Sequence, residues 1–193
     1  MRTEGKLLLA SASLRRQDLL RAAGIEFEVY PADIAEDRKD GEPAIQFAVR
    51  LAREKAERIA ARFPGAFVLG ADTIVVVDEE VLGKPRDAED AARMLRLLSG
   101  RSHQVTTAVS LIAPAKPAET RWVTSEVTFR EFREEEIRLY VAGGEPMDKA
   151  GAYAIQGGAA PWVVRLEGDY SNVVGLPLSL VSEMLHALGF LQA

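Results

Sequence analysis

The chain has 193 residues, of which 48% are hydrophobic and 27% charged, so it is long enough for a single domain spanning residues 1–193 with a sizeable core. Its net charge of -5 gives no global attraction to nucleic acid or to an anionic membrane, and we expect neither as a stable partner. The absence of cysteine excludes disulfides, thiolate zinc sites and cysteine nucleophiles. Without an export signal or an apolar run of membrane-spanning length, a cytoplasmic location is expected.

Strand and helix signals alternate along the first half of the chain. A short apolar run at 7–10 predicts a strand, and the next helix is expected at 14–23, ending at Gly24. Pro43 begins a longer helix to about residue 62. The further strands are predicted at 27–30, 67–77, 81–82, 104–112, 121–132 and 163–166, and the further helices at 87–98, 134–141 and 178–188. Two adjacent long strands after an alternating half indicate an α/β fold with a mixed sheet.

Four polar residues, Ser11, Ser13, Arg15 and Arg16, lie at the start of the first predicted helix. A serine is a normal N-cap, but two arginines in the first turn face the positive end of the helix dipole, which costs about 0.3–1 kcal/mol each when exposed. A bound anion reverses that sign, because backbone N–H groups, hydroxyls and guanidinium groups together form a phosphate site. The alternative is a solvated arginine pair at a helix end.

Two charged residues interrupt apolar patterns. Asp72 lies within the apolar stretch 68–77, where a buried carboxylate must be paired, protonated or metal-bound, and Gly70 before it allows close backbone approach. The alternative for Asp72 is a strand end or a turn. Lys55 falls on the apolar stripe of the long helix, so its ammonium group either reaches back to water or points into a polar site.

Three further residues give weaker signals. Lys84 precedes a proline after a short strand and could reach a phosphate, and Glu36 lies in an acidic loop and could ligate a metal. Gln156 lies in a glycine-rich segment, and its amide could read a base edge through donor and acceptor together. Each of these has an ordinary alternative as a solvated or loop-stabilising side chain. Neither histidine of the chain has the spacing of a metal ligand.

The common nucleotide-binding loops G-x-x-x-x-G-K-[ST] and G-x-G-x-x-G are both absent. Seven short motifs, in order along nearly the entire chain, instead resemble the Maf family of nucleoside triphosphate pyrophosphatases. They are Ala10–Arg16, Leu51–Ala56, Gly70–Thr73, Gly83–Pro85, Leu97–His103, Asp148–Gly151 and Asn172–Pro177. The sequence departs from the family pattern at Ala35, where the loop before Glu36 usually carries a second acidic residue, and after Gly157.

The resemblance implies an elongated α/β fold like that of the inosine triphosphate pyrophosphatases, with a mixed twisted sheet, flanking helices and a deep cleft between two lobes. It implies hydrolysis of a nucleoside triphosphate to the monophosphate and pyrophosphate with a divalent cation, magnesium or manganese. It also implies a cytoplasmic protein, often a homodimer, from a family linked to septum formation and cell-division arrest.

Carried over by matching motif, Asp72 is the proton acceptor, and Arg15, Thr73 and Gln156 are the specificity residues of a branch that prefers dTTP and UTP. The phosphate-binding side chains are then Ser11, Ser13, Arg16, Lys55 and Lys84, and the metal ligands are Glu36 and Asp72. The role of Asp72 stays open between base and full metal ligand. Two alternatives also stay open: the same chemistry on another base, such as that of 7-methyl-GTP, or on a modified nucleotide, and a nucleotide-binding regulatory module.

Overall fold

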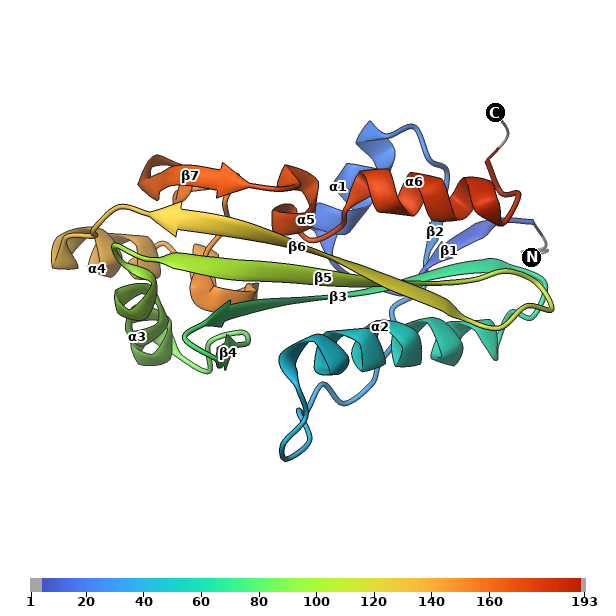
Figure 1. Cartoon of the computed structure of the whole chain (residues 1–193), viewed down its shortest axis with the longest axis horizontal. Helices are drawn as coiled ribbons and strands as arrows, with labels where there is room; N and C mark the ends of the chain where they lie inside the picture. The colour runs from blue at the N-terminus through green and yellow to red at the C-terminus, as the bar shows by residue number, and fades with distance from the viewer. Residues whose placement is uncertain (1–4, 192–193) are drawn as a thin grey trace. The chain divides into compact units, whose positions relative to one another are not determined.

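The computed structural model describes residues 5–191, and within them seven strands form one sheet (Figure 1). The strand order is β2-β1-β3-β5-β6-β7, with β4 paired to β3. The strands are β1 (Leu7–Leu9), β2 (Glu28–Val29), β3 (Phe67–Val77), β4 (Glu80–Leu82), β5 (Ser102–Ile112), β6 (Glu119–Phe129) and β7 (Val163–Glu167). The α-helices are α1 (Leu14–Ala22), α2 (Ala44–Ala60), α3 (Ala88–Leu98), α4 (Glu134–Ala142), α5 (Tyr170–Val174) and α6 (Leu178–Ala187). Three short 3-10 helices, η1 (Glu145–Asp148), η2 (Ala150–Ala152) and η3 (Ala160–Trp162), lie between α4 and β7.

The sheet is mixed, as the sequence predicts. β1 pairs in parallel with both β2 and β3, whereas β4 is antiparallel to β3 and β7 is antiparallel to β6. Hydroxyl contacts join Thr106 to Thr124 at 2.8 Å and Ser110 to Thr120 at 2.9 Å, so residue numbers rise on β5 as they fall on β6. That register makes β5 and β6 an antiparallel hairpin, joined by the loop of residues 113–118.

The described chain divides into two compact units. The first contains residues 5–72, 107–123 and 175–191, and the second contains 73–106 and 124–174. β3, β5 and β6 each contribute residues to both units.

In the first unit, β1 is buried on both faces, which explains its uninterrupted apolar sequence. Leu7 and Leu9 belong to a core cluster that includes Met184 of α6, whereas Leu8 belongs to a second cluster with Ala56 of α2. This alternation follows from the two-residue side-chain period of a strand. The first unit therefore packs helices against opposite faces of its strands.

Aromatic side chains fill much of the second unit. The His103 and Phe129 ring centroids are 4.9 Å apart, and His103 Nε2 lies 2.7 Å from the Tyr153 hydroxyl. Tyr140 and Trp162 meet edge to face at 4.9 Å. Burial lowers the pKa of His103 to about 4, so its ring is neutral at pH 7 and serves packing.

Most predicted elements are present within a residue or two of their expected ends, but two expectations need correction. β6 ends at Phe129 rather than at Phe132, because the amides of Arg130 and Phe132 bond outside the sheet, to Trp162 O and to Ser99 Oγ. The 3-10 helices and α5 were not predicted, since each is too short to show a helical period. No helix within residues 5–191 is both long enough and apolar enough to cross a bilayer.

Candidate active site

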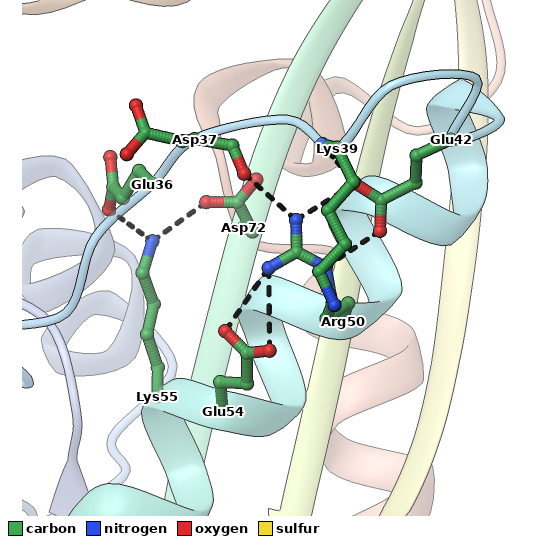
Figure 2. Close-up of polar contacts among 8 residues, drawn as sticks. All are labelled: Glu36, Asp37, Lys39, Glu42, Arg50, Glu54, Lys55 and Asp72. Atoms are coloured by element: carbon green, nitrogen blue, oxygen red, sulfur yellow. Dashed lines mark hydrogen bonds and ion pairs between the residues drawn. The ribbon is translucent and has the colours of Figure 1, made fainter.

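Asp72 and Glu36 are joined through one ammonium group, that of Lys55 (Figure 2). Lys55 Nζ donates to Asp72 Oδ1 at 2.7 Å and lies 2.6 Å from Glu36 Oε1. Asp72 comes from β3, Lys55 from α2 and Glu36 from the loop between β2 and α2. The Lys55 side chain is 8% exposed, so its ammonium group is held in a polar site and does not reach back to water.

A glycine on β3 lets Lys55 reach Asp72. A Cβ atom built on Gly70 would lie 2.3 Å from the Ala52 carbonyl oxygen and 2.8 Å from the Ala56 nitrogen, both on α2. Only a residue without a side chain allows the helix backbone to lie this close to the strand. The predicted close approach at Gly70 is therefore made by the backbone of α2.

The environment of Asp72 opposes ionisation on balance. Burial raises the pKa of its carboxyl group, and the positive charges of Lys55 and Arg16 offset part of that increase, while Glu36 adds to it. Of the three states that the sequence allowed for a buried carboxylate, the structure shows the paired one. A raised pKa at a paired, buried carboxylate is typical of functional groups.

Arg16 is a buried residue in the first turn of α1. Its Nε donates to the Gly175 carbonyl at 2.8 Å and its Nη1 donates to Ser11 Oγ at 3.1 Å. Ser13 caps the helix, accepting from the Arg16 amide at 3.5 Å. Burial lowers the pKa of the Arg16 guanidinium, Asp72 raises it, and neighbouring Arg15 lowers it. The alternative of two solvated arginines at the helix end is therefore wrong for Arg16, whose side chain is buried. No acidic residue in the first turn of α1 neutralises the positive end of the helix.

The remaining expected site residues, Thr73, Lys84 and Gln156, lie in the second unit. Thr73 is a half-buried residue of β3, Lys84 is exposed in the turn that follows β4, and Gln156 is exposed in a turn before η3. Two side chains outside the predicted set hold the backbone around Gln156: the Tyr140 hydroxyl accepts from the Ala154 amide, and Glu145 Oε2 accepts from the Gly158 amide, each at 3.0 Å.

The carboxylates of the first unit fit a divalent cation. Glu36 and Asp72 already converge on one positive charge, that of Lys55, and carboxylate oxygens are the ligands that Mg²⁺ prefers. No group of three or more His, Asp or Glu side chains in residues 5–191 is arranged to hold a metal. A site with the two carboxylates of Glu36 and Asp72 suits Mg²⁺, which is usually bound through one or two carboxylates together with substrate phosphates.

Sequence reasoning missed three residues around this site. Gly175 receives the Arg16 guanidinium, and it belongs to a motif, Asn172–Pro177, that the family resemblance had already marked. Arg50 and Glu42 join the loop that carries Glu36 to α2. An arginine near the start of a helix and a glutamate in an acidic loop carry no signal that would single them out.

The chain belongs to the Maf-like protein family, whose model matches residues 6–188. Among its relatives is a dTTP/UTP pyrophosphatase of Koribacter versatilis (strain Ellin345), 54% identical over 186 residues that cover 96% of this chain and 95% of that protein. A dTTP/UTP pyrophosphatase of Geobacter metallireducens is 52% identical over 99% of this chain and 100% of that protein. A third, from Geotalea uraniireducens (strain Rf4), is 50% identical over the full length of both chains.

Two solved structures share the fold. The Ham1 protein of Staphylococcus aureus matches with a TM-score of 0.52 at 14% identity, covering 94% of this chain and 98% of its own. A HAM1 protein from Coxiella burnetii matches with a TM-score of 0.51 at 15% identity and the same coverage. These likenesses confirm the predicted fold class, an α/β fold with a mixed sheet.

Proposed function

We propose that this protein hydrolyses dTTP and UTP to the nucleoside monophosphate and pyrophosphate. Water adds across the α–β phosphoanhydride bond, the P–O bond breaks, and pyrophosphate leaves. The observation that carries this proposal is the buried Asp72 carboxylate, paired with Lys55 and electrostatically coupled to Arg16. The proposed bases rest on the names of relatives that match almost the whole chain at about half identity.

Asp72 is the proposed proton acceptor for the attacking water. Its raised pKa supports this role, because a carboxylate with a higher pKa is a stronger base near neutral pH. Lys55 and Arg16 act in the other direction, favouring the charged form that can accept a proton. Burial and the two cations therefore act on the Asp72 carboxyl group in opposite directions.

Asp72 and Glu36 are also the residues that would hold a magnesium or manganese ion. When bound, such an ion screens the phosphate charges and lowers the pKa of a coordinated water. We propose that Lys55 exchanges its carboxylate partners for phosphate oxygens when the substrate enters. Charge stabilisation of phosphoryl oxygens is the main source of rate enhancement in such reactions.

The start of α1 is the proposed phosphate site of the first unit. Ser11, Ser13 and the first-turn amides offer hydrogen-bond donors, and Arg16 is held in place by the Gly175 carbonyl. Lys84 is proposed as a further phosphate ligand from the second unit.

Base selection is assigned to Arg15, Thr73 and Gln156. Gln156 is exposed on a turn whose backbone is held on both sides, so its side chain starts from a fixed backbone position and its amide is accessible. We expect Gln156→Glu to shift the preference among bases, because a carboxylate accepts hydrogen bonds but cannot donate them at neutral pH. An unchanged preference would contradict the assignment.

The test is a pyrophosphate-release assay over a panel of nucleoside triphosphates, with and without Mg²⁺ or Mn²⁺. We expect metal-dependent release from dTTP and UTP, and loss of release in Asp72→Asn. Release from a different base, such as that of 7-methyl-GTP, would keep the chemistry and overturn the base assignment. Binding of nucleotide without release from any triphosphate would favour a regulatory module, and full activity of Asp72→Asn would refute the role of Asp72.

A further inference from the structure

The loop that carries Glu36 is long and irregular. No helix or strand is formed between β2, which ends at Val29, and α2, which begins at Ala44. A free loop of this length samples many conformations, and fixing each of its residues costs backbone entropy. A carboxylate on such a loop can serve a defined cation site only if other contacts fix the loop.

Arg50 of α2 provides those contacts (Figure 2). Its Nε and Nη2 donate to the two carboxylate oxygens of Glu42, at 2.6 and 2.8 Å. Nη2 also donates to the Asp37 carbonyl at 3.0 Å, and Nη1 donates to Glu54 at 3.2 Å. The Glu42 carboxylate in turn accepts from the Lys39 amide at 3.1 Å. One guanidinium group thus joins two points of the loop, Asp37 and Glu42, to one helix.

The pair between Arg50 and Glu42 is well shielded for a loop contact. The Arg50 side chain is 19% exposed and that of Glu42 is 10% exposed. Hydrogen bonding to Arg50 lowers the pKa of Glu42 to about 2, so the pair stays charged throughout the neutral range. The contact is bidentate, and a lysine in place of Arg50 keeps the charge but cannot form two parallel hydrogen bonds.

The loop is attached to α2 at two consecutive residues by two different cations. Lys55 holds the Glu36 side chain, and Arg50 holds the Asp37 carbonyl. The peptide between Asp37 and Arg38 is therefore held by a contact that does not involve the Glu36 side chain. If Glu36 gives up Lys55, the backbone next to it remains tied to α2.

We propose that Arg50, together with Glu42, is a positioning residue that fixes Glu36 for binding of a divalent cation. This inference rests on the proposed function in taking Glu36 and Asp72 as the cation ligands. Arg50 acts on Glu36 through the loop, by its bonds to the Asp37 carbonyl and to the Glu42 carboxylate. Outer partners of metal ligands typically change metal affinity by about 10–100-fold when they are removed.

The variants that test this are Arg50→Lys and Glu42→Gln, with Arg53→Lys as the matched control. Arg53 lies on the same helix and pairs with Glu57 at 2.6 Å, but both side chains are about half exposed and away from the loop contacts. In the pyrophosphate-release assay, we expect the half-saturating Mn²⁺ concentration to rise about tenfold or more in the two test variants. We expect kcat at saturating Mn²⁺ to change much less, and we expect no change in the control.

Two measurements do not depend on turnover. Hydrogen exchange of the amides of residues 33–42, without nucleotide or metal, should be faster in Arg50→Lys and Glu42→Gln and unchanged in Arg53→Lys. Titration of the nucleotide-free protein with Mn²⁺, followed by electron paramagnetic resonance of the free ion, should show weaker binding in the same two variants. These readouts keep their meaning if the wild-type protein hydrolyses no triphosphate, an outcome that would refute only the proposed function.

Unchanged loop exchange in both test variants would overturn the inference, because the loop would then be fixed by other contacts. Faster exchange with unchanged Mn²⁺ binding and unchanged half-saturation would also overturn it, since the pair would then hold the loop without positioning a cation ligand. A general loss of stability would instead raise exchange across α2 and the sheet, which the same experiment resolves by segment.

Discussion

Replacing Gly70 by alanine should push α2 away from β3 and separate Lys55 from Asp72. The new Cβ would lie 2.3 Å from a backbone oxygen of α2, about 1 Å inside ordinary contact, and a backbone atom cannot rotate aside. Overpacking of this kind costs about 1–3 kcal/mol, and we expect a value near the upper end. In a chain of this size 1 kcal/mol lowers the melting temperature by roughly 2–4 °C, so a decrease of about 6–12 °C is expected.

The assay pairs differential scanning calorimetry with pyrophosphate release. Because a displacement of about 1 Å in a positioned group can cost about 100-fold in rate, activity should fall by about that factor at temperatures where Gly70→Ala is still folded. Gly83→Ala is the stability control, since a Cβ on Gly83 meets no atom within 4 Å. A melting temperature and an activity of Gly70→Ala both close to those of wild type would refute the argument that this contact sets the distance between helix and strand.

Three further outcomes follow from buried polar groups. Asp72→Asn should melt at or above the wild-type temperature, because the raised pKa of Asp72 means that its charged form is disfavoured; a lower melting temperature would contradict this. Between pH 6.5 and about 4 the unfolded chain binds a proton at His103 that the folded chain does not. The free energy of unfolding should therefore decrease by up to about 3 kcal/mol as the pH is lowered through this range. In urea titrations, His103→Gln should reduce this dependence on pH. Asn172→Ala should cost about 1–3 kcal/mol in the same titrations, because Asn172 is fully buried and donates to Val105 O and Ser125 Oγ, each at 2.9 Å; no loss would show that water replaces the amide.

Much of the fold could be predicted from the sequence because its elements carry their own signals. α3 begins after Asp87, whose side chain caps the helix, and α1 is followed by Gly24 with a positive φ, both as the sequence indicates. The segment from Glu145 to Trp162 could not be predicted in the same way. The backbone between η2 and η3 is held by α4, through the Tyr140 hydroxyl on the Ala154 amide, and contacts between distant residues leave no periodic pattern.

In the candidate site, too, some residues could be predicted from the sequence and others could not. The sequence marked Asp72 and Lys55 because each places a charge in an apolar pattern, and the structure brings the two together. It did not mark Arg50 or Glu42, because an arginine on a helix and a glutamate in an acidic loop are common and usually solvated. Which charged residues pair across the fold depends on tertiary packing, here on the close approach of α2 at Gly70.

The position of Lys55 has a consequence for how this protein folds. Its ammonium group lies between the two carboxylates that a metal would otherwise have to neutralise, and with Arg16 it balances the charges of Glu36 and Asp72. Small zinc-dependent domains unfold when their metal is removed, because the metal supplies folding energy. Here the chain brings its own counter-ion, so folding can be complete before any metal arrives. Under the proposed metal-dependent reaction, we therefore expect a chelator to abolish pyrophosphate release without unfolding the protein.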